Sequence, residues 1–292
     1  MNSQKKTVGV LGAGTMGAGI AIVMARAGYS TILYDIDEAG LRRGIDTVHG
    51  FFDRSMKLGK LDPAAGQAAK DSLIGSTDLV DLAPCEVVVE AVFEDLGLKK
   101  DLFAQLDEVV NDTALFHTNT STLSVTGIAS GSRLPERVVG THYCNPAPLM
   151  KLVEVADGRH TADWAHKATL EFLGSLGKTS VVTKDRPGFI LNRFLIPWEN
   201  SCIHALEAGV ASKEDIDTAV LGALGHPMGP FRLLDIVGMD IHQQVSMRLY
   251  EQLRDPKFYP PPMVERMVAA GDLGRKTGRG FYDYDDTRLF GS

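Results

Sequence analysis

Two ionisable residues, His142 and Glu154, lie in the two short apolar runs of the segment "VVGTHYCNPAPLMKLVEVADG". An imidazole exchanges protons near neutral pH, and a carboxylate against one ring nitrogen leaves the other nitrogen available as a base. If the two runs are neighbouring strands in the correct register, these residues form one acid–base unit. The spacing also fits two unrelated structural side chains, so both interpretations stay open at this point. The other histidines are interpreted as structural, namely His49, His117, His160, His166, His204, His226 and His242.

A glycine-rich turn, "GAGTMG", has the pattern G-x-G-x-x-G and stands between a strand-like run (7–11) and a helix-like run. In this setting the first glycine permits a tight turn and the second lets the backbone approach a pyrophosphate. The third allows the helix to pack closely on the strand. The alternative is a strand–helix–strand unit without a ligand. The residues expected to bind the cofactor here are Gly12, Gly14, Thr15, Met16 and Gly17.

Asp35 ends the next strand-like run, "STILYD". A carboxylate at this place accepts hydrogen bonds from a ribose diol and repels a 2′-phosphate. No arginine follows it directly, since Arg42 and Arg43 come later. The pattern therefore favours NAD over NADP, with a surface aspartate as the alternative.

Two polar residues complete the set of chemical candidates. Ser121 follows the run "ALFHTN", where loops of parallel sheets place ligand-binding groups. From the pattern alone a helix N-cap is the more common role for Ser121. Asn192 lies early in an apolar helix-like run, and asparagine is a poor interior helix residue. It therefore has a specific partner or is a satisfied buried amide.

The elements that must position these residues alternate between strand and helix. Fully apolar strands separated by helices indicate a parallel sheet covered on both faces. Residues 37–72 read as two helices, and from Pro187 onward the pattern is helical. We therefore predict an α/β fold: a Rossmann-like, doubly wound parallel sheet (1–186) that binds NAD, followed by a mostly helical domain (187–292).

Composition excludes several other functions. The chain has 292 residues and a net charge of −7, without a basic tract, which disfavours nucleic acid and anionic membranes as partners. Its apolar stretches are too short or too interrupted to span a bilayer. The three cysteines are widely spaced and show no zinc-like pattern, so no metal site is expected. A reduced, cytoplasmic protein without a signal peptide is the expectation.

Several segments together resemble the L-3-hydroxyacyl-CoA dehydrogenases, especially the short bacterial members that act on 3-hydroxybutyryl-CoA. They run in family order over nearly the whole chain. The segments are "VGVLGAGTMGAGIA", "VVVEAVFEDLGLKKDLFAQLD", "TNTSTLSV", "THYCNPAPLMKLVEV", "DRPGFILNRFLIP", "ASKEDIDTAV", "GHPMGPFRLLDIVGMD" and "LGRKTGRGFYDY".

The resemblance implies a role for each matching residue. His142 would be the catalytic base and Glu154 its orienting partner. Ser121 and Asn192 would hydrogen-bond the reacting oxygen of an acyl-CoA substrate or the surrounding catalytic network. The resemblance also implies that the helical domain (187–292) binds substrate and forms a homodimer. The residues expected to contact the nicotinamide half of NAD, or to close the cofactor site, are Glu94, Lys99, Asn145 and Lys276.

The sequence departs from the family pattern where coenzyme A is expected to bind. Val48 and Ser55 stand at two positions that usually carry a small polar residue or lysine. Arg54 and Lys57, with Lys60 nearby, remain as candidate phosphate-binding groups. One alternative is therefore a dehydrogenase of a free hydroxy acid, of the gulonate 3-dehydrogenase (lambda-crystallin) type. A second is a non-catalytic NAD-binding protein.

Overall fold

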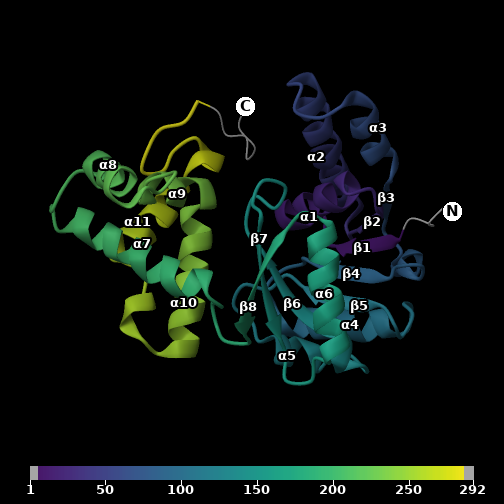
Figure 1. The fold of residues 1–292 in the computed structure, drawn as a ribbon. Helices are drawn as coiled ribbons and strands as arrows, with labels where there is room; N and C mark the ends of the chain where they lie inside the picture. Colours follow the sequence, from purple (N-terminus) through teal and green to yellow (C-terminus); the bar gives the residue numbers. More distant parts are fainter. Residues whose placement is uncertain (1–5, 286–292) are drawn as a thin grey trace. The chain divides into compact units, whose positions relative to one another are not determined.

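The computed structural model describes residues 6–285, and the chain divides into two compact units, Met1–Phe189 and Ile190–Ser292. Each unit is described by itself (Figure 1).

The first unit is built on one eight-stranded sheet with the order β3-β2-β1-β4-β5-β6-β7-β8. This order reverses between β1 and β4, as in doubly wound folds, where ligands bind beyond the carboxyl ends of the strands. The predicted Rossmann-like fold is thus confirmed. The strands are β1 (Thr7–Leu11), β2 (Ser30–Tyr34), β3 (Leu73–Ser76), β4 (Val87–Glu90), β5 (Leu115–Thr118), β6 (Val138–Tyr143), β7 (Leu152–Asp157) and β8 (Thr179–Lys184).

One pair of strands departs from the predicted parallel arrangement: β6 and β7 are antiparallel, whereas the other neighbouring strands are parallel. The reason is the link 144–151, because a parallel pair needs a crossover of about a dozen residues or more. A short link lets the chain turn straight back, and this geometry places His142 directly opposite Glu154.

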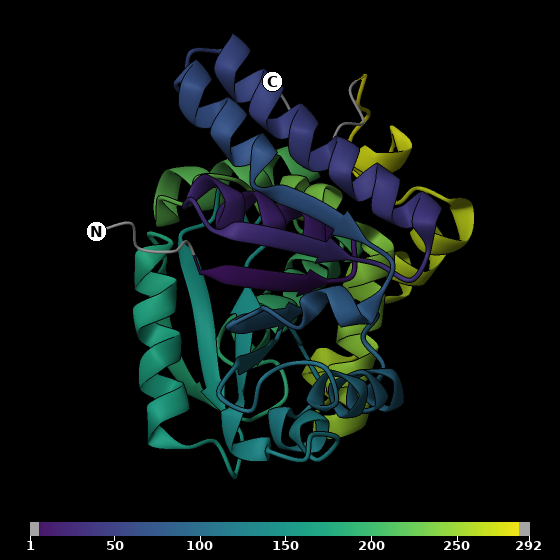
Figure 2. The ribbon, with the colours of Figure 1, turned by 90° about the vertical axis from the view of Figure 1, so that its right-hand side faces the viewer.

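Helices cover both faces of the sheet (Figures 1 and 2). One buried core joins α1, α2 and α6 to the sheet, and a second joins α4 and α5 to its other face. Asp37 caps α2 and Asp95 caps α4 by accepting backbone hydrogen bonds. The helices are α1 (Thr15–Arg26), α2 (Glu38–Lys57), α3 (Pro63–Asp71), α4 (Leu96–Asp107), α5 (Val125–Ala129) and α6 (Asp163–Ser175), with 3₁₀ turns η1 (Leu79–Leu82) and η2 (Pro135–Arg137).

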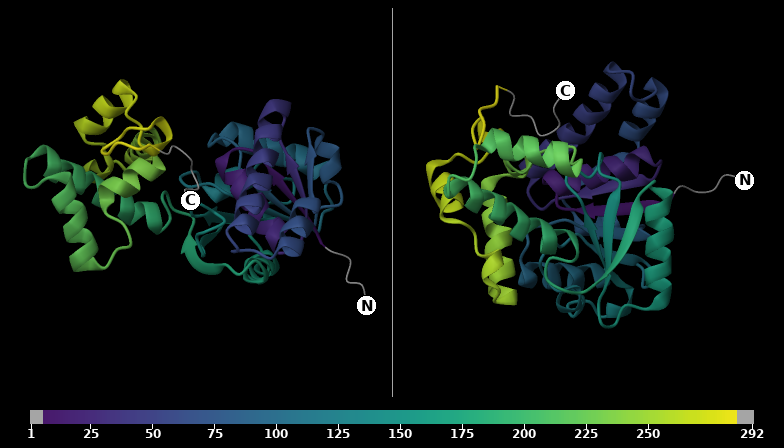
Figure 3. Two further views of the ribbon diagram at one scale, coloured as in Figure 1. Left: turned by 90° about the horizontal axis from the view of Figure 1, so that it is seen from above. Right: turned by 60° about the vertical axis from the view of Figure 1, so that its left-hand side comes forward.

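The second unit consists of helices and turns within its described residues (190–285), as predicted (Figure 3). Phe231 and Phe281 pack in its core with ring centroids 4.6 Å apart. Asp235 accepts hydrogen bonds from Phe281 N and Tyr282 N, which fastens the last described segment to α9. The elements are α7 (Leu191–Glu207), α8 (Lys213–Leu224), α9 (Pro230–Val237), α10 (Met239–Leu253), η3 (Pro256–Phe258), α11 (Pro262–Ala270) and η4 (Arg275–Thr277).

No helix among residues 6–285 is long and apolar enough to cross a membrane. The same residues contain no cluster of three or more His, Cys, Asp or Glu side chains that could hold a metal ion.

A fully buried histidine in the sheet makes the stability of the first unit depend on pH. His117 in β5 has no exposed surface, and its Nε2 lies 2.9 Å from Thr169 Oγ1. Burial lowers the pKa of His117 to about 3. The unfolded chain, with an ordinary pKa near 6.5, takes up a proton first as pH falls. Stability from this group is therefore complete above about pH 6.5 and is lost as pH falls toward 3.

We expect the wild-type protein to lose about 2 kcal/mol of unfolding free energy near pH 5 from this group. His117→Gln, which retains a hydrogen-bonding partner for Thr169 but cannot titrate, lacks this loss. Urea unfolding near neutral pH and near pH 5 measures both proteins. Equal losses in the two would contradict the assignment.

Candidate active site

The glycine turn has the geometry of a phosphate-binding loop. Gly12 has φ +91°, and a Cβ there would lie 2.7 Å from Ala91 O. A Cβ on Gly17 would lie 1.7 Å from Gly12 O, so both positions require glycine. Around Gly14, by contrast, a Cβ would meet nothing within 4 Å, which leaves room for a pyrophosphate before the N-terminus of α1. Thr15 and Met16 form the first turn of that helix.

Asp35 lies directly after β2 and is fixed against this turn. Its Oδ2 accepts a hydrogen bond from Ala13 N at 2.7 Å, and its Oδ1 accepts one from Asp37 N at 3.0 Å. These bonds fix the carboxylate beside the glycine turn, as a ribose-binding residue requires. The glycine turn and Asp35, which follow the carboxyl ends of β1 and β2, therefore fit a dinucleotide.

Asp35→Asn is expected to lower kcat/KM with NAD by roughly 10-fold, because a carboxylate binds hydroxyl groups more strongly than an amide does. With NADP the variant should improve, because the repelling charge is gone. Steady-state kinetics with both cofactors measure this, with Asp37→Asn, which changes the cap of α2, as the control. Equal kcat/KM values for NAD and NADP in the wild type would contradict the role of Asp35.

His142 and Glu154 form the predicted pair. They are register partners on β6 and β7, and His142 Nδ1 lies 2.7 Å from Glu154 Oε2. The Glu154 side chain is 1% exposed and that of His142 is 12% exposed. An ionised carboxylate only accepts hydrogen bonds, so Nδ1 carries the proton and Nε2 of the neutral ring has the free lone pair. The geometry thus assigns Nε2 as the basic atom.

Phe189 is a residue of this site that sequence reasoning missed. Its ring centroid lies 5.9 Å from that of His142, and the residue is buried with φ +45°. A left-handed backbone conformation is unusual for a bulky residue. In the sequence, Phe189 lies within "DRPGFILNRFLIP", one of the segments that resemble the family, but nothing local to this segment links it to His142.

Ser121 lies in the turn after β5, where Glu94 holds the backbone. Glu94 Oε1 accepts hydrogen bonds from Ser121 N at 2.8 Å, Thr122 N at 3.0 Å and Thr120 Oγ1 at 2.6 Å. The N-cap interpretation of Ser121 is wrong, because Ser124 caps α5 by accepting from Gly127 N at 3.1 Å. Glu94 therefore fixes the backbone conformation of the turn that contains Ser121.

Lys99 is enclosed rather than open to solvent. Its side chain is 0% exposed, and its Nζ lies 2.6 Å from Glu90 Oε1 and 3.2 Å from Glu94 Oε2. Burial acts to raise the pKa of Glu94, but the charge of Lys99 and the donors of the Ser121 turn outweigh it and lower the pKa to about 2. Burial raises the pKa of Glu90, which the same ammonium opposes. Glu90 is a second residue that the sequence analysis did not select.

Asn145 is exposed in the link after β6. Two basic side chains from other elements hold the backbone of this link. Lys178 Nζ donates to Ala147 O at 2.6 Å and to Met150 O at 2.7 Å. Arg26 donates to Pro148 O. Desolvation by partial burial lowers the pKa of Lys178 to about 8. These contacts position the segment that follows His142.

The candidate coenzyme A residues lie on α2. Arg54 is half-buried and Lys57 is exposed near the C-terminal end of this helix. Val48 is fully buried in the core beneath α2, so its departure from the family pattern does not change the surface. Ser55 is half-buried.

Asn192 and Lys276 belong to the second unit. Asn192 lies in the first turn of α7. Lys276 lies in η4, and its Nζ is bound to Asp240 Oδ1 at 2.6 Å. Their roles toward the residues of the first unit stay predictions.

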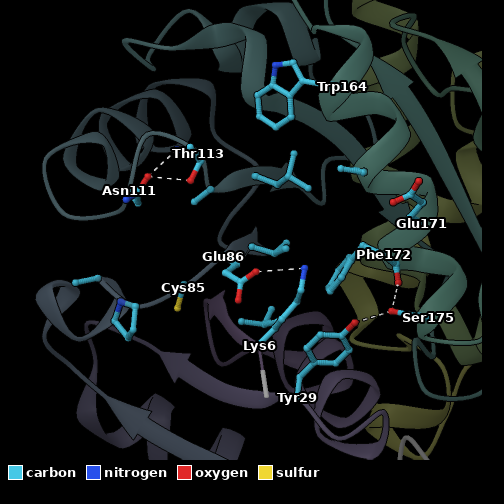
Figure 4. Close-up of a pocket in the computed structure, with 17 residues that line it drawn as sticks. Lys6, Tyr29, Cys85, Glu86, Asn111, Thr113, Trp164, Glu171, Phe172 and Ser175 are labelled. Atoms are coloured by element: carbon cyan, nitrogen blue, oxygen red, sulfur yellow. Dashed lines mark hydrogen bonds and ion pairs between the residues drawn. The ribbon is translucent and has the colours of Figure 1, made fainter. Parts of the chain in front are cut away.

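A hollow of about 630 Å³ lies at the end of the sheet opposite to the glycine turn (Figure 4). It lies at the amino ends of β1, β4 and β5, and Trp164, Tyr29 and Phe172 line part of it. Some of its polar groups are paired with one another, as in the ion pair of Lys6 with Glu86 at 3.2 Å. Asp35, Ser121 and His142 lie near the carboxyl ends of β2, β5 and β6, so we do not assign this hollow to the active site.

A glycine turn with the geometry of a phosphate-binding loop, a carboxylate directly after β2 and a histidine–carboxylate pair are together typical of a dinucleotide-dependent dehydrogenase. The chain belongs to the 3-hydroxyacyl-CoA dehydrogenase family: the NAD binding domain of that family matches residues 7–186, and its C-terminal domain matches residues 188–284.

Individual relatives match almost the whole chain. A 3-hydroxybutyryl-CoA dehydrogenase of Mycobacterium tuberculosis is 41% identical over 286 residues, covering 97% of this chain and 100% of the relative. A 3-hydroxyadipyl-CoA dehydrogenase of Escherichia coli is 42% identical over 280 residues, covering 96% of this chain and 59% of the relative. The crystal structure of (S)-3-hydroxybutyryl-CoA dehydrogenase from Ralstonia eutropha has a TM-score of 0.88 at 39% identity, covering 97% of this chain and 100% of that chain.

Proposed function

We propose that this protein catalyses the reversible, NAD-dependent oxidation of short-chain L-3-hydroxyacyl-CoA esters to 3-ketoacyl-CoA, with His142 as the general base. The observation that carries this proposal is the 2.7 Å contact of His142 with Glu154. The names of the similar proteins support the substrate class, with 3-hydroxybutyryl-CoA as the first candidate.

In the oxidation, Nε2 of His142 takes the proton of the substrate's 3-hydroxyl group as the C3–H bond breaks. Glu154 accepts a hydrogen bond from Nδ1–H throughout and stabilises the imidazolium that forms. Bound NAD supplies the electron acceptor for the hydride that leaves C3. In the reverse direction the imidazolium returns its proton to the ketone oxygen. One imidazole therefore serves both directions.

The cofactor would be held by residues at the carboxyl edge of the sheet. The glycine turn would bind the pyrophosphate and Asp35 the adenosine ribose. Glu94, Asn145 and Lys276 would serve the nicotinamide half, and Lys99 would act through Glu94, because its ammonium is enclosed.

The substrate would be held by Ser121 and Asn192 at its reacting end and by Arg54 and Lys57 at coenzyme A. Val48 departs from the family pattern, but it is buried and so does not change the surface that coenzyme A would contact. NADH formation from L-3-hydroxyacyl-CoA esters of increasing chain length tests the proposal, with free 3-hydroxybutyrate and gulonate as controls. Turnover of a free acid without turnover of any ester would overturn it.

We also propose a cytoplasmic homodimer formed by the second unit. All three cysteines are free thiols, which fits a reducing compartment. Among the apolar side chains of this unit, Phe194 is 71% exposed and Leu224 61% exposed, whereas Leu234 is buried within the unit. We expect light scattering to give twice the monomer mass at micromolar concentration. A monomer at that concentration would contradict the dimer.

A further inference from the structure

A buried charge cluster lies at the carboxyl ends of β4 and β5. We define it as Glu90, Lys99 and Glu94. Glu90 and Lys99 have no exposed side-chain surface, and that of Glu94 is 18% exposed. Two carboxylates share one ammonium, so the cluster has a net charge of −1 when both carboxylates are ionised.

The bonding of Glu90 fits its ionised form. Lys99 Nζ donates to Oε1 at 2.6 Å, Val92 N donates to Oε1 at 2.8 Å, and Thr118 Oγ1 donates to Oε2 at 2.7 Å. Each of these three groups donates, and a carboxylate is the form that only accepts. Glu94 is saturated in the same way by the donors of the Ser121 turn.

The topology places this cluster under one half of the cofactor. A dinucleotide lies across the point where the strand order reverses, between β1 and β4. Asp35, at the end of β2, lies on the adenosine side. The other half of the dinucleotide therefore extends over β4 and β5, where Glu90 is the last residue of β4. The nicotinamide ring is positively charged when oxidised and neutral when reduced.

We propose that Glu90, by making this cluster net negative, biases the site toward the oxidised cofactor over the reduced one; the inference rests on the proposed function. Without the charge of Glu90, Lys99 and Glu94 form a neutral pair, and the attraction for a cationic ring is lost. Glu90 is a positioning residue in this account, because it acts through Lys99 and Glu94 and through the field of the cluster.

The test is the ratio of the dissociation constants of NAD and NADH, measured by calorimetric titration. In Glu90→Gln this ratio should rise by roughly 3- to 10-fold, because the attraction between the net charge of the cluster and the cationic ring is lost. The matched control is Glu86→Gln at the other end of the same strand, where the carboxylate is half-exposed and paired with Lys6. This control should keep the wild-type ratio.

A double variant separates charge from shape. Glu90→Gln with Lys99→Gln removes both charges, so the cluster keeps a net −1 on Glu94, and the wild-type ratio should return. An unchanged ratio in Glu90→Gln, an equal shift in Glu86→Gln, or a double variant as shifted as the single one would overturn the inference.

Two further results have defined meanings. If Glu90→Gln does not fold, Glu94→Gln removes the same unit of charge and should shift the ratio in the same direction; an unshifted ratio there would overturn the inference. A wild-type protein that binds neither NAD nor NADH would overturn the proposed function itself. If both nucleotides bind to the wild-type protein but the ratio does not shift in the variants, the inference about Glu90 fails and the proposed function is unaffected.

Discussion

His142→Gln is expected to lower kcat for the oxidation of L-3-hydroxybutyryl-CoA by ~10²–10⁴-fold, which is the usual contribution of a general base. The affinity for NADH should stay near the wild-type value, because the proposed dinucleotide-binding groups, the glycine turn and Asp35, lie at the ends of other strands. Glutamine occupies similar space but cannot accept the substrate proton at a useful rate. Stopped-flow kinetics and NADH titration measure the two quantities separately.

The matched control for this variant is His166→Gln. His166 also pairs with a carboxylate of β7, since its Nδ1 lies 2.9 Å from Asp157 Oδ1, but it lies on α6. Its substitution should leave kcat within about twofold of the wild type, as surface substitutions usually do. If both variants lost activity equally, a general loss of fold would be the cause and His142 would lose its assigned role.

Glu154→Gln is expected to lower kcat by ~10²–10⁴-fold as well, with little change in KM or in NADH affinity. The amide can donate a hydrogen bond to Nδ1, which would turn the lone pair of His142 toward β7 and leave the proton on Nε2. It also lacks the charge that stabilises an imidazolium 2.7 Å away. A primary deuterium isotope effect with substrate labelled at C3 should increase, because the chemical step becomes slower than product release.

Asp157→Asn on the same strand is the control for Glu154→Gln. A structural role for Glu154 would lower the melting temperature and leave the isotope effect unchanged. The orienting role predicts the reverse pattern: a larger isotope effect with a near-normal melting temperature. Glu154→Asp, which keeps the charge, should recover part of the lost kcat.

The first unit was largely predictable because its signals are local. Apolar strands alternating with helices predict a parallel sheet, and the glycine turn is recognised by its spacing together with its place between a strand and a helix. The antiparallel turn at β7 was not predicted from the pattern, although the short link 144–151 contains the reason for it. The His142–Glu154 contact could not be predicted with certainty from the sequence, because it depends on the register between β6 and β7. Two residues 12 positions apart are opposite each other in only one such register.

The charge cluster shows what sequence patterns leave out. Lys99 stands near the start of a helix with charged neighbours and resembles a solvent-exposed residue in sequence. It is buried because Glu90 ends a fully buried strand directly beside it. Such long-range pairing depends on how α4 packs against the sheet. For the same reason, Asn192 and Lys276 are assigned by resemblance, since no local pattern links them to His142.

The most direct test of the account is a single turnover with enzyme in excess over L-3-hydroxybutyryl-CoA and with saturating NAD. The wild-type protein should form NADH and 3-ketobutyryl-CoA in a 1:1 ratio. His142→Gln should reach the same amounts at a rate ~10²–10⁴-fold lower. The absence of NADH with the wild-type protein, or an equal rate in the variant, would contradict the claim that His142 removes the hydroxyl proton of a 3-hydroxyacyl-CoA.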